Sequence, residues 1–251
     1  MSRYAILDSQ WNVIKDHMPG RIGMKGVTAK DNRLFFDALI HMARAGCPWR
    51  DLPKEFGKWN SVFKRYDRWA KSGVLNKILD LLKVESDFEW VMVDSSVIRA
   101  HQSAAGAKGG GQKNQSLGRS KGGFSTKIHL AVDSFGNPIR VELTGGEVHD
   151  SQRSKSLIKG IPAENVLADK GYDSNEFRQS IIEMGAQPVI PPRSNRKTFI
   201  DYDRHLYKER NMIERTFIKL KHYRKIATRY DKKAANFMRY ILLGSIMIHL
   251  R

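Results

Sequence analysis

Trp90-Val-Met-Val-Asp94 is a short apolar run that ends in an acid, and Asn165-Val-Leu-Ala-Asp169 has the same form. Short apolar runs of this kind predict buried strands. Three early strands are expected at residues 89–97, 125–132 and 137–143. The turn signal Asp133-Ser-Phe-Gly-Asn-Pro138 separates the second from the third, and strands joined by so tight a turn should pair antiparallel.

Beyond residue 150, helical and strand patterns alternate. Helices are expected at about residues 151–159 and 175–184, with a strand ending at Asp169 between them and a short strand at residues 187–190 after them. Antiparallel strands followed by this alternation imply an α/β fold with a mixed sheet and helices on its faces. Asp150 is placed to cap the first helix. Asp173, four residues beyond Asp169, could either support that acid or cap the second helix, and the cap is favoured.

The first part of the chain has a helical pattern instead. Asp31 is placed to cap a helix through about residues 34–45. We therefore expect a small all-helical N-terminal domain at residues 1–87, followed by the sheet domain at residues 88–251. An apolar segment at residues 240–250 predicts a buried C-terminal helix.

The last helix of the N-terminal domain, from about residue 60, has a basic outer face. Four aromatic residues recur at helical spacing: Trp59, Phe63, Tyr66 and Trp69. Four basic residues lie off this stripe: Lys64, Arg65, Arg68 and Lys71. The aromatic stripe predicts a core. The basic face is compatible with binding in a DNA groove or with simple solvation, and the pattern does not separate these hypotheses.

The composition favours a polyanionic partner. The 251 residues contain 44 Lys and Arg against 26 Asp and Glu, a formal charge of +18. Nucleic acids are the usual partners of such chains. No acid occurs at residues 95–132, and the basic residues there are Arg99, Lys108, Lys113, Arg119, Lys121 and Lys127. The glycine-rich part, residues 102–123, is expected to be a mobile loop without core, serving as a linker or ordering on DNA.

Several other classes of protein are disfavoured. One cysteine excludes an intramolecular disulfide framework and fits a reducing cytoplasm. The apolar segment at residues 240–250 falls far below the ~18 residues that suggest a membrane span. No Walker lysine motif, His-Glu-x-x-His or hydrolase nucleophile motif is present.

Glu214 lies in a strongly basic helix expected at residues 207–225, on one face with Tyr207, Arg210 and Lys221. Two strand-terminal aspartates and this glutamate could meet in space to hold divalent metal. Two Mg²⁺ ions about 3.5–4 Å apart can hold the attacking and leaving oxygens of a phosphodiester. The alternative is a solvated helix face with an ordinary Arg210–Glu214 pair.

The spacing Tyr207, Arg210, Glu214, Lys221 matches the signature around the catalytic glutamate of the DDE transposases of bacterial insertion sequences. The chain resembles the group named after insertion sequence five, related to that named after insertion sequence four. The segments 93–102 and 167–173 are also similar to this group. So is the helical region from Asp31 to Trp69, and the resemblance covers nearly the whole chain.

The resemblance implies a ribonuclease-H-like catalytic domain, with Asp94 on its first strand, Asp169 on its fourth and Glu214 on the following helix. These acids would bind two Mg²⁺ or Mn²⁺ ions. Water would cleave the transposon end, and the freed 3′-hydroxyl would attack target DNA without a nucleotide cofactor. Arg210 and Lys221 would hold phosphates near the glutamate, and Tyr207 would help position the end.

The expected partners are double-stranded DNA, namely the terminal inverted repeats and the target, and further copies of the chain in a dimer or larger assembly. A bacterial cytoplasm, at the nucleoid, is the expected location, with no membrane. Two alternatives stay open: a ribonuclease-H-like nuclease without strand transfer, and a catalytically idle repressor that occupies the repeats.

Overall fold

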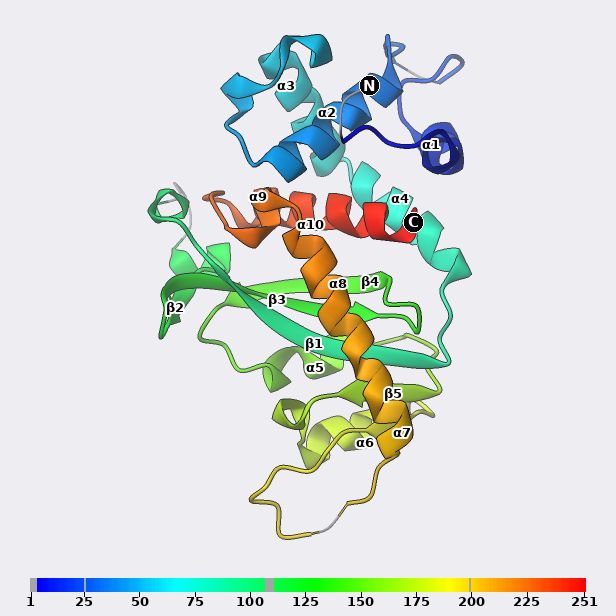
Figure 1. Cartoon of the computed structure of the whole chain (residues 1–251), viewed down its shortest axis with the longest axis vertical. Coiled ribbons are helices and arrows are strands. Elements are labelled where there is room, and N and C mark those ends of the chain that lie inside the picture. Colours follow the sequence, from blue (N-terminus) through cyan, green and yellow to red (C-terminus); the bar gives the residue numbers. More distant parts are fainter. Residues whose placement is uncertain (1–3, 25, 107–110, 199) are drawn as a thin grey trace. The chain divides into compact units, whose positions relative to one another are not determined.

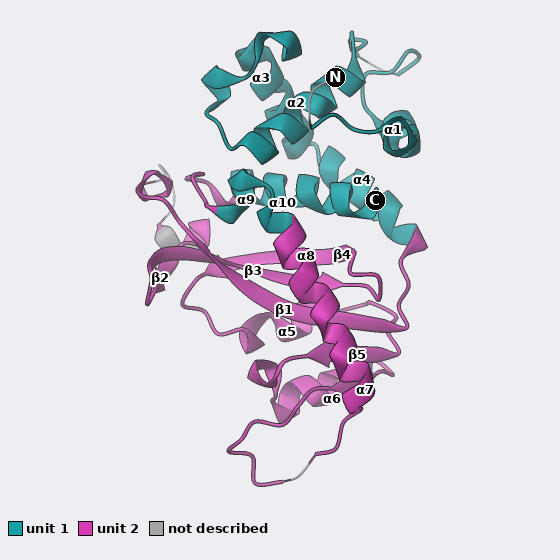
Figure 2. Cartoon of the chain, viewed as in Figure 1, with its two compact units in different colours: residues 1–84, 220–227, 236–251 teal, residues 85–219, 228–235 magenta. Residues whose placement is uncertain are grey.

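The computed structural model describes residues 4–24, 26–106, 111–198 and 200–251 (Figure 1). The chain forms two compact units, shown in separate colours in Figure 2. The first comprises residues 1–84, 220–227 and 236–251, and the second residues 85–219 and 228–235. The change of unit near residue 84 lies close to the boundary expected from the sequence. Two C-terminal segments, however, pack with the N-terminal helices, so the first unit is discontinuous in sequence.

The first unit is helical, as expected. Its α-helices are α1 (Asp8–Ile14), α2 (Asn32–Ala45), α3 (Trp59–Lys71), α4 (Val74–Leu82), α9 (Arg224–Ala227) and most of α10 (Ala234–His249). Asp31 caps α2 as expected, because its carboxylate accepts a hydrogen bond from the Leu34 amide at 2.8 Å. The expected buried C-terminal helix is confirmed as α10. Tyr240 stacks on Tyr66 of α3 at 5.9 Å between ring centroids, and Arg239 pairs with Asp67 at 3.0 Å.

The second unit contains a mixed sheet. Its strands are β1 (Trp90–Arg99), β2 (Gly118–Ser120), β3 (Gly123–Val132), β4 (Pro138–Gly145), β5 (Asn165–Ala168) and β6 (Gln187–Val189). The order is β2-β3-β1-β5-β6, with β4 also paired to β3. β3 is antiparallel to β1 and β4, whereas β5 is parallel to β1 and β6. The mixed sheet expected from the element order is therefore confirmed, in a ribonuclease-H-like α/β fold.

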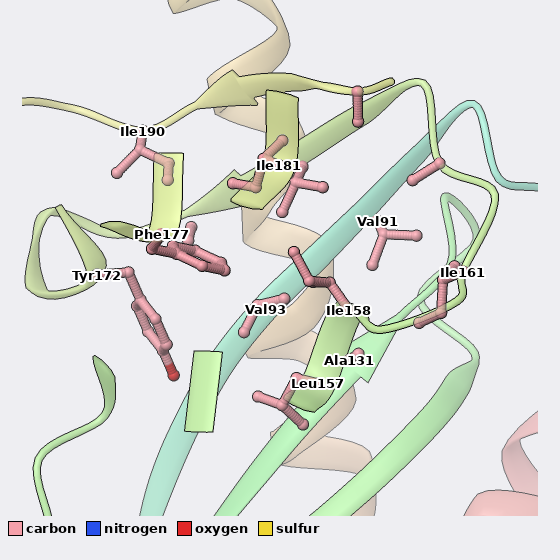
Figure 3. Close-up of a cluster of buried hydrophobic side chains, with 14 of the residues drawn as sticks. Val91, Val93, Ala131, Leu157, Ile158, Ile161, Tyr172, Phe177, Ile181 and Ile190 are labelled. Carbon is pink, nitrogen blue, oxygen red and sulfur yellow. The ribbon is translucent and has the colours of Figure 1, made fainter. Parts of the chain in front are cut away.

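Helices cover both faces of the sheet. α5 (Ser151–Ile158) and α6 (Asn175–Glu183) bury an apolar core against β1 and β5 (Figure 3). Figure 1 shows α8 (Asn211–Lys221) crossing the strands on the opposite face. Val91 and Val93 belong to the α5–α6 core. Because strand side chains alternate, Asp94 points to the other face, toward α8.

Three boundaries differ from the sequence expectations. β1 runs on to Arg99, two residues beyond the expected end, and Asp94 lies in the middle of the strand although it ends the apolar run. The basic helix expected at residues 207–225 is interrupted: α7 (Arg204–Tyr207) is followed by a 3₁₀ turn and then by α8. The helix α8 ends at Lys221. The loop at residues 102–123 was expected to lack core, yet Ala104 and Leu117 are buried and β2 pairs with β3. Two isolated apolar residues and a three-residue strand leave too weak a periodic pattern to be recognised.

Among the helices of the described part of the chain, none has the length and apolar character needed to cross a membrane.

Gly136, in the turn between β3 and β4, supports α8. It has a φ of +80°, and its carbonyl accepts a hydrogen bond from Thr216 Oγ1 of α8 at 2.6 Å. A Cβ at this position would meet Met212 Cγ at 2.6 Å. Close approach and a left-handed backbone together require glycine here.

We expect Gly136→Ala to lower the free energy of unfolding by about 2–4 kcal/mol, since backbone strain and overpacking add. Gly185→Ala is the matched control, because Gly185 has a φ of +86° and a Cβ added there would meet no other described atom within 4 Å. It should cost only the strain, about 1 kcal/mol. Urea denaturation measures both, and equal costs would contradict the packing argument.

Candidate active site

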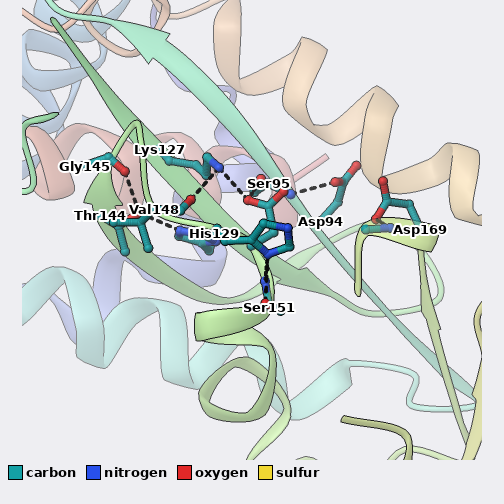
Figure 4. A network of polar contacts seen from close by, with 12 residues as sticks. Asp94, Ser95, Lys127, His129, Thr144, Gly145, Val148, Ser151 and Asp169 are labelled. Carbon is teal, nitrogen blue, oxygen red and sulfur yellow. Dashed lines mark hydrogen bonds and ion pairs between the residues drawn. The ribbon is translucent and has the colours of Figure 1, made fainter. Parts of the chain in front are cut away.

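Two aspartates emerge side by side from neighbouring parallel strands. Val93 of β1 is in register with Ala168, the last residue of β5, so the residues that follow them, Asp94 and Asp169, lie at the same end of that pairing. Figure 4 shows the two carboxylates close together. Each is oriented by a backbone amide, from Ser95 to Asp94 at 2.7 Å and from Gly171 to Asp169 at 2.9 Å.

Arg210 joins Asp94 to the third acid. Its Nη1 donates to Asp94 Oδ2 at 3.0 Å, and its Nη2 pairs with Glu214 Oε1. The Arg210 side chain is 16% exposed, whereas that of Glu214 is 50% exposed. Tyr207 places its ring 5.8 Å from the guanidinium carbon. The structure thus brings Asp94, Asp169, Tyr207, Arg210 and Glu214 into one neighbourhood.

The carboxylate of Asp94 is poorly stabilised where it stands. Burial raises its pKa to about 6, and the nearby Asp169 adds to the increase. The amide of Ser95 and the guanidinium of Arg210 act in the other direction without cancelling it. Burial also disfavours the charged form of Arg210, but Asp94, Tyr207 and Glu214 together outweigh this effect, and the pKa of Arg210 is raised.

Asp94→Asn is expected to stabilise the metal-free protein at neutral pH. The pKa of Asp94 is raised from 3.8 to about 6 in the folded state. The protonated carboxyl therefore adds stability below pH 3.8, and this contribution is lost as the pH rises through 6. The ionised carboxylate therefore costs up to about 3 kcal/mol at pH 7, and the neutral amide avoids much of this cost. We expect a gain of about 1–3 kcal/mol in urea denaturation at pH 7.5 that disappears near pH 4. A variant less stable than the parent at both pH values would contradict the burial argument.

A second polar network lies next to Asp94 (Figure 4). Lys127 Nζ pairs with Asp150 Oδ1 at 2.8 Å, and Ser95 Oγ donates to the same oxygen at 2.7 Å. Asp150 was expected to cap α5, but its side chain makes no capping hydrogen bond, because these two partners hold it. Burial disfavours the charge of Asp150, but the bonds from Lys127 and Ser95 outweigh this effect and lower its pKa. No local sequence pattern signals this network, since its members come from β1, β3 and the start of α5.

Asp173 has a structural role instead of the expected helix cap. Ser174 caps α6, its Oγ accepting from the Phe177 amide at 3.2 Å. The Asp173 side chain is 1% exposed and pairs with Arg178 at 2.8 Å and Arg196 at 2.9 Å. Burial disfavours its charge, but hydrogen bonds from Arg196, the Arg193 amide and Arg178 outweigh this effect and lower its pKa to about 2.

The remaining basic candidates divide by exposure. Exposed side chains belong to Lys64, Arg68, Arg99, Arg119, Lys121 and Lys221. Arg65 is packed inward, with its guanidinium carbon 4.1 Å from the Phe35 ring centroid and a hydrogen bond to Asn32. Lys108 and the side chain of Lys113 lie outside the described part of the structure.

The acids offer the hard oxygen donors that Mg²⁺ and Mn²⁺ prefer. Asp94 and Asp169 fit such an ion, because their carboxylates lie close together (Figure 4) and the charge of Asp94 is disfavoured mainly by burial, with a smaller contribution from Asp169. Arg210 already places a cation between Asp94 and Glu214. Within the described residues, however, no three His, Cys, Asp or Glu side chains are arranged to hold one ion as they stand. In this conformation, the Glu214 carboxylate is held in an ion pair with Arg210.

Two family models match this chain, and both are described as transposases. Residues 6–79 match the family described as "Putative transposase of IS4/5 family", and residues 86–250 match the family described as "Transposase DDE domain". A protein of Brucella ovis named as a putative transposase for insertion sequence element IS6501 is 38% identical, over 51% of this chain and 100% of that protein. An uncharacterized protein y4sN of Sinorhizobium fredii is 46% identical, over 51% of this chain and 94% of that protein.

A solved structure shares the fold. The piggyBac transposase, determined in a synaptic complex with hairpin DNA, superposes with a TM-score of 0.55 at 12% identity. The match covers 96% of this chain and 70% of that one.

Proposed function

This chain belongs to the Transposase DDE domain family, and from that premise we propose that it cleaves the ends of an insertion sequence and joins them to target DNA, with Asp94, Asp169 and Glu214 as its catalytic acids. Its function as an insertion-sequence transposase accords with relatives that carry that name. These relatives do not favour a nuclease without strand transfer or an idle repressor.

The observation that carries the assignment is the bridge made by Arg210. It contacts a carboxylate on β1 and one on α8, beside a third carboxylate at the end of β5. Acids far apart in the sequence thereby converge on one face of the sheet. A structural ion pair would require one carboxylate, whereas phosphodiester chemistry requires several at one place.

We propose that Asp94, Asp169 and Glu214 hold two Mg²⁺ or Mn²⁺ ions. When bound, such ions supply charge that activates the attacking oxygen and stabilises the leaving oxygen of a phosphodiester. The sheet holds the two aspartates rigidly, with the amides of Ser95 and Gly171 fixing their orientation. Arg210 aligns the more exposed Glu214 and adds positive charge for the DNA strand, and Lys221 extends that charge along α8.

The test uses purified protein, a labelled duplex with the terminal inverted repeat, a supercoiled plasmid and Mg²⁺. Cleavage at the repeat boundary followed by a joined product is the expected result, with both lost on addition of a chelator. Cleavage without joining in either Mg²⁺ or Mn²⁺ would replace the proposal by a nuclease. Repeat binding without any cleavage would replace it by a repressor.

The helical unit is proposed to bind the transposon end through the exposed face of α3. Lys64→Ala with Arg68→Ala should weaken binding to the repeat duplex about 10-fold and reduce the salt dependence by about two phosphate contacts. Lys54→Ala with Lys77→Ala is the matched control, because these exposed lysines lie on other elements of the same unit. Equal losses in both double variants, measured by mobility shift at several salt concentrations, would remove α3 from the DNA contact.

Arg65 is left unchanged in that experiment for a structural reason. Its guanidinium packs between Phe35 and Trp69. Its removal would disturb the core, so lost binding could not be attributed to a lost DNA contact.

A further inference from the structure

A polar cavity of about 490 Å³ lies beside the acids, between the chain segments that precede α5, follow β5 and follow β6. It is lined by His149, Lys170, Gly171, Arg193, Ser194 and Asn195. None of these side chains is used in the proposed chemistry. The lining contains a lysine and an arginine, which are positively charged at neutral pH, together with a histidine and no acidic residue.

The guanidinium of Arg193 is fixed at this cavity by the backbone. Its Nη2 donates to the Gly171 carbonyl at 2.6 Å and its Nε to the Lys170 carbonyl at 3.2 Å. Its amide donates to the buried Asp173 at 2.8 Å. Carbonyl oxygens orient a guanidinium but carry no net charge. Across the described residues, neither Arg193 nor Lys170 forms an ion pair with an acidic side chain, so both charges remain available to an anion.

The walls of the cavity are connected to the acids. Lys170 and Gly171 directly follow Asp169, and the Gly171 amide holds Asp169 Oδ1. On the other wall, His149 precedes Asp150, which accepts a hydrogen bond from Ser95, the neighbour of Asp94. A group bound in the cavity would therefore lie next to the phosphodiester on which the acids act.

We propose that this cavity binds a backbone phosphodiester of a DNA strand, adjacent to the scissile phosphate. Arginine, lysine, serine and asparagine side chains are common donors to DNA phosphates, and a preoriented guanidinium suits phosphate oxygens. The volume exceeds that of a phosphate alone, leaving room for the adjoining sugar. This inference rests on the proposed function, since it takes the strand to be the one whose phosphodiester the acids act on. That strand belongs either to the transposon end or to the target.

The test combines protein and DNA variants. Lys170→Gln and Arg193→Gln are compared with Lys197→Gln, an exposed lysine of the same loop outside the lining. Single phosphates near the cleavage site are made neutral by methylphosphonate substitution, in the end duplex in one arm and in a target duplex in the other. Binding is measured at several salt concentrations. Lys170 makes no side-chain contact among those described, so its variant tests the site even if Arg193→Gln loosens the loop.

We expect Lys170→Gln to weaken binding about 5- to 10-fold and to reduce the salt slope by about one contact, with Lys197→Gln nearly unchanged. A methylphosphonate at one position should weaken DNA binding by the parent protein by a similar factor. It should not weaken DNA binding by the Lys170→Gln variant any further. The arm in which this occurs identifies the strand. Additive effects at every phosphate in both arms, or unchanged binding by Lys170→Gln, would overturn the proposal.

Failure of the two proposals can be told apart. If the parent protein cleaves and joins DNA while Lys170→Gln binds as the parent does, the function stands and the phosphate site falls. If the parent never cleaves but Lys170→Gln still removes the effect of one methylphosphonate, the phosphate site stands and the transposase chemistry falls.

Discussion

Glu214→Gln is expected to reduce cleavage at the transposon end by about a thousand-fold or more while leaving end binding intact. Removing one member of a group that acts as a unit usually costs about as much as removing all of them. The amide keeps the size of the side chain and can still accept a hydrogen bond from Arg210. It cannot supply the negative oxygen that a divalent cation requires.

Glu209→Gln provides the matched control. Glu209 is exposed and lies on the 3₁₀ turn that precedes α8. Its substitution removes one negative charge, as Glu214→Gln does. Nonspecific attraction to DNA therefore changes equally in both variants, and only Glu214→Gln should lose cleavage. Asp94→Asn and Asp169→Asn should lose it to a similar extent, and a double variant should be little worse than either.

Metal binding supplies a readout that does not depend on turnover. Mn²⁺ or Mg²⁺ should raise the melting temperature of the parent protein by mass action, and the increase should shrink in Asp94→Asn and Glu214→Gln. A Glu214→Gln variant that folds, binds the repeat and cleaves at the parent rate would remove Glu214 from the active site.

Asp173→Ala is expected to cost about 3–5 kcal/mol of stability, because it leaves buried arginine charge without its partner. Asp173 pairs with Arg178, which is 7% exposed, and with Arg196, which is 16% exposed. It also accepts the amide of Arg193. The loop after β6 therefore loses its anchor to the segment that follows Asp169, and cleavage should fall together with stability.

Asp201→Ala is the control for this substitution, since Asp201 is an exposed acid of the same loop whose carboxylate accepts only from the Tyr202 amide among the described contacts. Its expected cost is below about 1 kcal/mol. The lowered pKa of Asp173 makes the free energy of unfolding depend on pH. The stability that the ionised carboxylate contributes is present above pH 3.8 and is lost as the pH falls toward 2. Urea denaturation at pH 7 and near pH 3 should show the gap between parent and Asp173→Ala narrowing. A constant gap would contradict the ion-pair explanation.

The sequence was a good guide to the elements of the fold. The strands β1, β3, β4, β5 and β6 and the helices α5, α6 and α10 lie close to their expected positions. Apolar alternation, turn residues and caps such as Asp31 act over a few neighbouring residues, so their signals are local. The same reasoning failed at β2 and at the break after Lys221, where the deciding contacts are not local.

The sequence predicted which residues belong to the candidate site but not the contacts between them. The runs ending at Asp94 and Asp169 and the helical spacing around Glu214 singled out three acids, and their catalytic role stays a prediction. The spacing also paired Arg210 with Glu214, but nothing in it indicated that Arg210 reaches Asp94 on β1. Likewise, Asp150 and Asp173 looked like caps, because a helix start is visible in sequence whereas the buried lysine and arginine partners are not.

Residue types and short-range spacing were therefore sufficient for most of the strands and helices, for the basic character of the chain and for the candidate acids. Tertiary structure alone decided that α10 packs with the N-terminal helices, that Arg210 bridges two acids, and that Lys170 and Arg193 line one cavity. These outcomes depend on strand register and on side-chain conformations between residues distant in sequence. No local pattern carries that information, because the burial that selects among such contacts exists only once the sheet has formed.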